Sequence, residues 1–175
     1  MEQHRTIVNI SKLDYEFPKY IKQTTGSNPF VCFTCRTCSS LCTSGKVNVL
    51  NIAKIVRQIA LGLKDSVLES KEIWTCATCM KCQEFCPQGV NPLDMIYFLQ
   101  NKAVEAGTPT VPQAYVEMVK NIIKIGLIQP PQEAISADFD EFDREELELP
   151  DLSMPDAEKI KKNLLKTGFR HVINR

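Results

Sequence analysis

Two stretches of the chain share one spacing of cysteines and decide the fold. The first is Cys32-Phe33-Thr34-Cys35-Arg36-Thr37-Cys38-Ser39-Ser40-Leu41-Cys42, and the second is Cys76-Ala77-Thr78-Cys79-Met80-Lys81-Cys82-Gln83-Glu84-Phe85-Cys86-Pro87. Both read C-x2-C-x2-C-x3-C, and together they hold all eight cysteines of the 175-residue chain. The chemistry of the protein is therefore concentrated in these two motifs.

Clustered cysteines have three ordinary uses in proteins: disulfides, zinc binding and iron–sulfur ligation. Disulfides need an oxidising compartment and close longer loops than these spacings allow. A four-cysteine zinc site usually draws C-x2-C pairs from two separated points of the chain. The run C-x2-C-x2-C-x3-C, with proline after its last cysteine, is instead an iron–sulfur run. The spacing therefore favours iron–sulfur clusters, and zinc is the alternative.

The doubling of the motif also predicts how the ligands are shared. In two-cluster ferredoxins the fourth cysteine of each run ligates the other cluster, so we expect two [4Fe–4S] clusters with exchanged fourth ligands. Cluster one is predicted to bind Cys32, Cys35, Cys38 and Cys86. Cluster two is predicted to bind Cys76, Cys79, Cys82 and Cys42. All eight cysteines are then iron ligands, and none is left as a redox-active thiol.

The first motif departs from the full pattern at one position. Cys42 is followed by Thr43, whereas Cys86 is followed by Pro87. Proline restricts the backbone that leaves the ligand loop, so its absence is expected to loosen the turn without removing a ligand. The two histidines, His4 and His171, lie near the ends of the sequence, far from both motifs, so a Rieske centre with two histidine ligands is not supported.

Three basic residues, Arg36, Lys46 and Lys81, lie in or beside the motifs. Positive charge near a cluster is expected to raise its reduction potential, and such residues also suit a docking face.

An internal repeat surrounds the motifs and predicts the fold class. Every cysteine recurs after 44 residues, as from Cys32 to Cys76, and each motif leads into an apolar segment with helical spacing. In the first half Asn48 is the expected N-cap and Gly62 the expected end; in the second, Asn91 caps a helix that starts at Pro92. We therefore expect an all-α, α-helical ferredoxin-like core with two cluster loops and extended terminal segments.

The apolar positions of the two helices define the expected core. They are Ile52, Ile55, Val56 and Ile59 in the first half, and Leu93, Ile96, Leu99 and Ala103 in the second. A further short helix is expected near 64–70, a third clear helix from about Pro112 to Ile125, and a basic helix from Pro155 to Thr167.

The flanking segments suggest three parts. Residues 1–28 are expected to form an N-terminal extension that packs on the core, 29–126 the ferredoxin domain, and 127–175 a C-terminal extension. From Glu133 to Asp151 there are nine acidic residues and one basic residue, after which the sign of the charge reverses. A solvated linker is one interpretation of such a charge run. The interleaved phenylalanines and leucines favour the other, a segment that docks on a partner.

Composition and absent motifs narrow the function classes. With 21 acidic and 21 basic residues the net charge is zero, which gives no reason to expect nucleic acid or an anionic membrane as partner. The longest stretch without a charge runs from Gln23 to Cys35, too short and too polar to span a membrane. No secretory signal or nucleotide-binding motif is visible. We therefore expect a cytoplasmic one-electron carrier without a substrate site or catalytic residues.

The residues of the two motifs resemble a known family, the heterodisulfide reductase C subunits. The resemblance rests on both cysteine motifs, on Val90-Asn91-Pro92 and on the chain length, and covers about residues 25–126. It implies an electron-transfer subunit that carries electrons from a flavin- and iron–sulfur-bearing A-type subunit to a B-type subunit with Cys-Cys-Gly motifs. In that family the B-type subunit reduces the disulfide of coenzyme M and coenzyme B. An obligate hetero-oligomer is expected on this basis.

Other functions use similar modules and remain alternatives. The iron–sulfur subunits of succinate dehydrogenase and fumarate reductase carry an additional [2Fe–2S] domain, and no cysteine precedes Cys32 here. Glycerol-3-phosphate and glycolate oxidases usually fuse Cys-Cys-Gly domains to the module, and this chain has no Cys-Cys pair. A zinc-stabilised scaffold without a redox role is the alternative from a different class.

Overall fold

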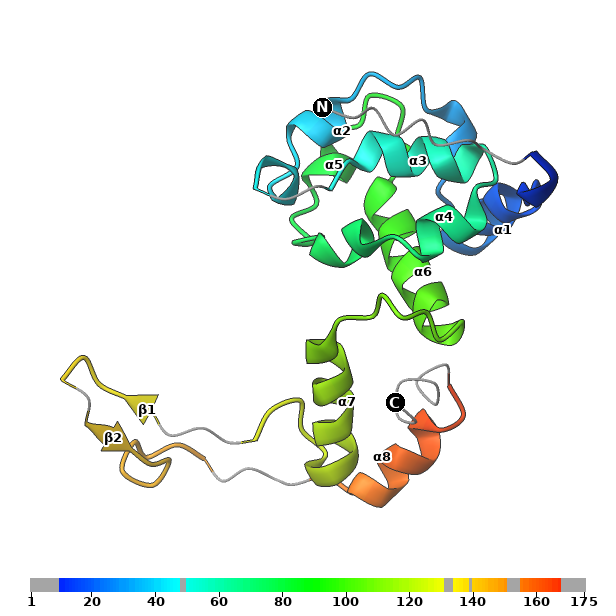
Figure 1. Ribbon diagram of the computed structural model, residues 1–175. Helices are drawn as coiled ribbons and strands as arrows, with labels where there is room; N and C mark the ends of the chain where they lie inside the picture. The colour runs from blue at the N-terminus through cyan, green and yellow to red at the C-terminus, as the bar shows by residue number, and fades with distance from the viewer. Residues whose placement is uncertain (1–9, 48–49, 131–133, 139, 151–154, 168–175) are drawn as a thin grey trace, which may run out of the picture. The chain divides into compact units, whose positions relative to one another are not determined.

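The computed structural model describes residues 10–47, 50–130, 134–138, 140–150 and 155–167. The chain divides into two compact units, Met1–Val111 and Pro112–Arg175, which are described separately (Figure 1). The division falls one helix before the domain end expected at residue 126, because the helix that follows Pro112 packs within the second unit.

Unit 1 is built from short helices around two longer ones. Its α-helices are α1 (Phe17–Thr25), α2 (Thr37–Ser40), α3 (Ile52–Ala60), α4 (Lys64–Leu68), α5 (Lys81–Glu84) and α6 (Pro92–Glu105). Its 3-10 turns are η1 (Ile10–Lys12), η2 (Pro29–Val31), η3 (Ser44–Lys46) and η4 (Lys71–Thr75). α6 packs against α1, α3, α4 and α5, and α2 packs against α5 (Figure 1). The predicted helical core is thereby confirmed.

The core of unit 1 lies between α3 and α6, as the apolar spacing predicts. All eight expected core positions are buried: Ile52, Ile55, Val56, Ile59, Leu93, Ile96, Leu99 and Ala103. Phe17 and Ile21 of α1 are buried on the same core, whereas Tyr15 and Tyr20 are exposed. Tyr20 instead makes an edge contact with Phe98, with ring centroids 5.5 Å apart. The segment before residue 28 is therefore part of unit 1 from Ile10 onward.

The beginnings of the two long helices differ from each other. α3 is capped by Asn51, whose side chain accepts a hydrogen bond of 3.0 Å from the Lys54 N–H. Asn48, the cap expected from the sequence, lies outside the described residues, and the helix starts three residues later than that cap implies. α6 begins at Pro92 after Asn91, as expected, but Asn91 has φ 52° and its side chain makes no capping hydrogen bond.

Gly62 follows α3 and lets the chain at the end of this helix approach the segment before α1 closely. Its φ is 73°, and its carbonyl accepts a hydrogen bond of 2.9 Å from the Asp14 N–H. A Cβ at this position would lie 2.5 Å from the Asp14 carbonyl oxygen. Glycine is therefore required here both by conformation and by space.

Unit 2 contains α7 (Gln113–Ile125), β1 (Ala134–Ile135), β2 (Glu141–Phe142) and α8 (Ala157–Leu164). α7 and α8 pack against each other, and α7 ends at Gly126 with φ 76°, as expected from the sequence. The two short strands form an antiparallel pair with Ala134 opposite Phe142. This hairpin lies in the acidic stretch, where no strand was expected. Gly168, the expected end of the basic helix, lies outside the described residues.

Candidate iron–sulfur site

Each cysteine motif folds as a loop followed by one turn of helix. The third cysteine of each motif lies on that turn, Cys38 on α2 and Cys82 on α5. α2 and α5 lie against each other, so the two motifs are brought side by side from positions 44 residues apart, the distance from Cys38 to Cys82. Six of the cysteines lie in or against the hydrophobic core of unit 1: Cys32, Cys38, Cys42, Cys76, Cys82 and Cys86.

The loops share an unusual backbone conformation. Thr34 and Arg36 in the first motif have φ of 60° and 64°, and the matching Thr78 and Met80 have 52° and 61°. The left-handed conformation costs a non-glycine residue roughly 1–2 kcal/mol, and such strain concentrates at functional sites. In each motif, one left-handed residue between the first and second cysteines and one between the second and third turn the chain tightly. Sequence propensity carries no signal for this feature, because none of the four residues is glycine.

One pocket collects four cysteines from both motifs. It is lined by Cys32, Cys35 and Cys38 of the first motif and by Cys86 of the second. Apolar groups complete the lining, among them Phe33, Ala53, Val56, Pro87 and Val90. The structure thus brings together the four residues that were predicted to bind cluster one.

The remaining four cysteines, Cys42, Cys76, Cys79 and Cys82, are the second predicted group. The Thr43 hydroxyl, next to Cys42 in the first motif, donates a hydrogen bond of 3.5 Å to the Cys79 Sγ atom of the second motif. Burial is the main cause of a raised pKa at Cys76 and at Cys82, and repulsion from Cys42 adds to it at both. The contact between Thr43 and Cys79 brings the end of the first motif, with Cys42, to the second motif, as the ligand set predicted for cluster two requires.

Cys82 lies where the two groups of cysteines meet. Burial, followed by the neighbouring Cys76, Cys38, Cys42 and Cys79, raises the pKa of the Cys82 thiol to about 12. Cys38, on the other side of this contact, also has a raised pKa, chiefly because it is partly buried. Buried thiols that resist ionisation become stable as thiolates once a metal centre neutralises their charge.

Backbone N–H groups point at the fourth cysteine of each motif. The Gly45 N–H donates to the Cys42 Sγ atom at 3.2 Å, and the Val90 N–H donates to the Cys86 Sγ atom at 3.3 Å. A Cβ on Gly45 would lie 2.9 Å from the Leu50 carbonyl oxygen and 3.1 Å from the Cys42 Cβ atom. A glycine at this position therefore lets the chain turn close enough to donate to the sulfur.

The second cysteine of each motif faces solvent. Cys35 and Cys79 are exposed, whereas Cys42 and Cys82 are buried. A hydrogen bond with the Thr37 side chain is the main cause of a lowered pKa at Cys35. The hydrogen bond from the Thr43 hydroxyl is the main cause of a lowered pKa at Cys79, followed by the Lys81 N–H. Each predicted group of four cysteines thus has one thiol at the surface.

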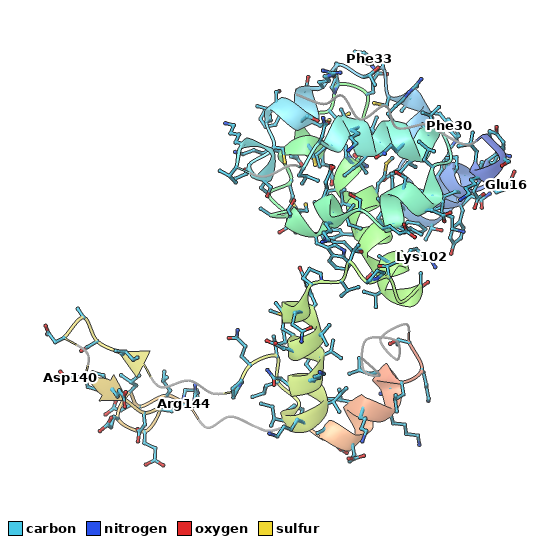
Figure 2. All side chains as sticks on the ribbon, viewed as in Figure 1. Glu16, Phe30, Phe33, Lys102, Asp140 and Arg144 are labelled. Carbon is cyan, nitrogen blue, oxygen red and sulfur yellow. The ribbon has the colours of Figure 1, made fainter. Side chains whose placement is uncertain are left out.

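Exposed apolar and basic side chains lie in and beside the two motifs. Phe33, Met80 and Phe85 are exposed by 57%, 54% and 60%, and the basic Arg36, Lys46 and Lys81 are exposed as well. Figure 2 shows Phe33 on the edge of unit 1 opposite Lys102. His4 and His171 lie outside the described residues.

The donor set fits a pair of [4Fe–4S] clusters. Each group offers four sulfur ligands, as such a cluster requires, and backbone and hydroxyl donors point at the sulfurs. The walls of the first pocket are otherwise mostly apolar, which limits the access of water to a bound cluster. Among the described residues, no helix is long and apolar enough to cross a membrane.

Comparison with known proteins agrees with this geometry. A family model described as a 4Fe-4S dicluster domain matches residues 31–91. The C subunit of the H(2):CoB-CoM heterodisulfide,ferredoxin reductase of Methanothermobacter thermautotrophicus is 30% identical over 174 residues, covering 99% of this chain and 93% of the relative.

Two further relatives carry related names. The C subunit of the ferredoxin/F(420)H(2)-dependent CoB-CoM heterodisulfide reductase of Methanosarcina acetivorans is 30% identical over 138 residues, covering 78% of this chain and 83% of the relative. The iron-sulfur C subunit of the CoB--CoM heterodisulfide reductase of Methanopyrus kandleri is 36% identical over 104 residues, covering 59% and 53%.

The fold and the domain match define the chain as an iron–sulfur protein of the 4Fe-4S dicluster class with a helical, ferredoxin-like core. Within that class, the chain belongs to the family of heterodisulfide reductase C subunits. The family resemblance read from the two motifs is thereby confirmed. Members of this family are subunits of an oxidoreductase.

Proposed function

We propose that this chain relays electrons, one at a time, through two [4Fe–4S] clusters within a cytoplasmic heterodisulfide reductase type of complex. The observation that carries the proposal is the pocket in which Cys86 joins Cys32, Cys35 and Cys38. A zinc site or a disulfide framework has no need of a fourth thiol exchanged between duplicated motifs, whereas two-cluster ferredoxins share their ligands in this way.

The proposed ligand sets follow the two groups of cysteines. Cluster one would be held by Cys32, Cys35, Cys38 and Cys86, and cluster two by Cys76, Cys79, Cys82 and Cys42. When bound, each cluster supplies a site that accepts and gives up one electron. The chain itself positions the thiols, directs N–H groups at Cys42 and Cys86, and shields the inner ligands within the core.

The arrangement of the cysteines suggests a path across unit 1. Cys38 and Cys82 lie where the two groups meet, and Cys35 and Cys79 lie exposed at the surface. An electron would enter beside one exposed thiol, pass between the groups near Cys38 and Cys82, and leave beside the other. Within this relay the chain has a non-catalytic role, and the disulfide chemistry takes place on a partner.

The proposed partners follow from the family. An A-type subunit with flavin and iron–sulfur centres would supply electrons, and a B-type subunit with Cys-Cys-Gly motifs would receive them. The B-type subunit would reduce the CoM-S-S-CoB heterodisulfide or a related disulfide. The names of the relatives support this assignment, since they describe CoB-CoM heterodisulfide reductases.

We also propose that residues 127–175 dock on a partner subunit, while residues 29–126 carry the relay. In the acidic stretch, Ile135, Phe142, Leu147 and Leu149 remain exposed by 64%, 36%, 42% and 46%. A linker that only needs solvation gains nothing from exposed apolar groups, whereas a segment that docks can bury them. Figure 2 shows Asp140 and Arg144 on the hairpin and on the turn after it.

Anaerobic purification with iron and sulfide analysis and electron paramagnetic resonance tests the proposed cofactors. We expect about eight irons per chain, four for each of two clusters, and two signals that appear on reduction. A colourless protein that contains two zinc ions and no reducible centre would contradict the proposal.

Co-purification tests the proposed partners. The tagged full-length chain should retain a subunit with Cys-Cys-Gly motifs, and deletion of residues 133–175 should weaken that association while both clusters stay loaded. Retention of a flavin dehydrogenase alone would point to another oxidoreductase. Unchanged association after the deletion would exclude the docking role of the C-terminal segment.

A further inference from the structure

The motif residue that departs from the usual pattern makes a contact across the two halves of the repeat. The usual proline is present after Cys86, but Thr43 takes its place after Cys42. Thr43 is exposed, and its hydroxyl lies 3.5 Å from the Cys79 Sγ atom in the other motif. Proline has no side-chain donor and could not make this contact.

The other exposed thiol has a threonine of its own, at a different position. The Thr37 Oγ1 atom lies 3.3 Å from the Cys35 Sγ atom, two residues away in the same motif. The position that matches Thr37 in the second motif is Lys81, and the position that matches Thr43 is Pro87. Each surface thiol therefore meets one hydroxyl, although the duplication has not placed the two threonines at equivalent positions.

A thiolate that ligates iron can only accept a hydrogen bond, so both hydroxyls must act as donors to the ligated sulfurs. Reduction adds one electron to a cluster and increases the negative charge on its ligands without making or breaking a bond. A donor aimed at a ligand sulfur stabilises that added charge, and hydrogen bonds to sulfur are one of the means by which proteins set cluster potentials.

We propose that Thr43 raises the reduction potential of cluster two from within the first motif, as Thr37 does for cluster one from within its own. The inference rests on the proposed function, because it requires both clusters to be present. It gives the two threonines the role of positioning residues, which act on electron transfer through Cys79 and Cys35.

Redox titration of the anaerobically purified full-length chain, followed by electron paramagnetic resonance, tests the inference. Thr43→Val keeps the shape of the side chain and removes the hydroxyl. We expect the reduction potential of one cluster only to fall. At a fixed applied potential, the ratio of the reduced to the oxidised form of that cluster should fall by up to about tenfold, which corresponds to about 59 mV for a one-electron couple. Thr37→Val should lower the potential of the other cluster instead.

Three further variants separate potential tuning from folding. Thr43→Ser keeps the hydroxyl and should keep both potentials. Thr43→Pro gives the first motif the proline that the second motif has after Cys86. The φ of Thr43 is −60°, close to the value that proline requires, so this variant should fold and reproduce the shift of Thr43→Val. Thr75→Val removes a hydroxyl that is next to Cys76 but donates to the Glu72 carbonyl, and should leave both potentials in place.

The outcomes distinguish the inference from the proposed function. Unchanged potentials in Thr43→Val, a shift in Thr43→Ser equal to that in Thr43→Val, or a shift of the same cluster by Thr43→Val and Thr37→Val would overturn the inference while the relay stands. A parent chain that holds zinc and no reducible cluster would overturn the proposed function, and the inference with it.

Discussion

The two halves of the repeat have the same cysteine spacing but support it with different contacts. The first half follows its fourth cysteine with Thr43 and caps its helix through the Asn51 side chain. The second half follows it with Pro87 and enters its helix through Asn91 in a left-handed conformation, without a side-chain cap. The two halves thus share their cysteine spacing and their left-handed loop residues, but each holds its turn by contacts of its own.

The largest effect is expected from breaking the exchange of ligands. Cys86→Ser removes a thiol that comes from the second half but lines the pocket of the first. We expect the variant to lose cluster one, about half of the iron, and much of the stability of unit 1, because metal binding and folding are coupled. Iron analysis and the remaining paramagnetic signal measure this.

The matched control for that exchange is Cys42→Ser, which should lose the other cluster and retain the one that Cys86→Ser loses. Loss of the same signal in both variants would contradict the exchanged ligands.

A smaller effect is expected from emptying the core that the two halves share. Leu99 on α6 is fully buried, and Leu→Ala at such a site removes packing and leaves a cavity. Leu99→Ala should lower the free energy of unfolding of the loaded protein by about 2–5 kcal/mol. Denaturant unfolding under anaerobic conditions measures the change. Leu61→Ala, at a leucine that is 45% exposed, is the control and should change it by less than about 0.5 kcal/mol.

The different helix starts predict different responses at two asparagines. Asn51→Ala removes the acceptor for the Lys54 N–H and for the Ser39 hydroxyl, which links α2 to α3. We expect it to cost about 1 kcal/mol in thermal or denaturant unfolding. Asn91→Gly should be neutral or slightly stabilising, because its φ of 52° suits glycine and its side chain provides no cap. Equal losses at both positions would show that the two helix starts are held in the same way.

The smallest effect is expected at Lys102, a charged residue near the end of α6 that has no counterpart on α3. A hydrogen bond with the Glu105 carboxylate is the main cause of a raised pKa at Lys102, whose ammonium also lies 5.4 Å from the Tyr20 ring centroid. A pKa raised on folding stabilises the fold below the pKa of the unfolded chain, about 10.5. That contribution is lost as the pH rises through the folded pKa.

Unfolding measured below and above the pKa of Lys102, at about pH 9 and about pH 12, tests the contribution of this residue. The Glu105 side chain is exposed and that of Lys102 is partly exposed, so solvent screens the pair. As the pH rises, the free energy of unfolding of the parent should fall by less than about 1 kcal/mol more than that of Lys102→Met. A parent and a variant that lose the same stability between about pH 9 and pH 12 would exclude the contribution.

The helices and the motifs could be predicted from the sequence because both have residues that recur at regular spacings. The apolar spacing of α3 and α6 predicted their buried faces, and Gly126 predicted the end of α7. The ligand sets remain a prediction, which the grouping of the eight thiols supports.

Other features left no such mark. The left-handed residues of the loops are ordinary threonine, arginine and methionine, whose conformation is imposed by the surrounding turn. The sequence did not identify Asn51 as the cap of α3, because Asn48 and Asn51 lie within one turn and propensity does not distinguish them. The hairpin of β1 and β2 spans only two residues on each strand, too short for an alternating pattern to be read.

The position of Cys86 in the first pocket also constrains how the protein is made. During synthesis, Cys32, Cys35 and Cys38 leave the ribosome long before their fourth partner exists. If Cys86 is a ligand of cluster one, as proposed, that cluster can be completed only after the second motif has been translated and α5 has reached α2. Cofactor insertion would then be a late event that waits for both halves, and a chain truncated before residue 86 would be unable to hold cluster one with its full set of ligands.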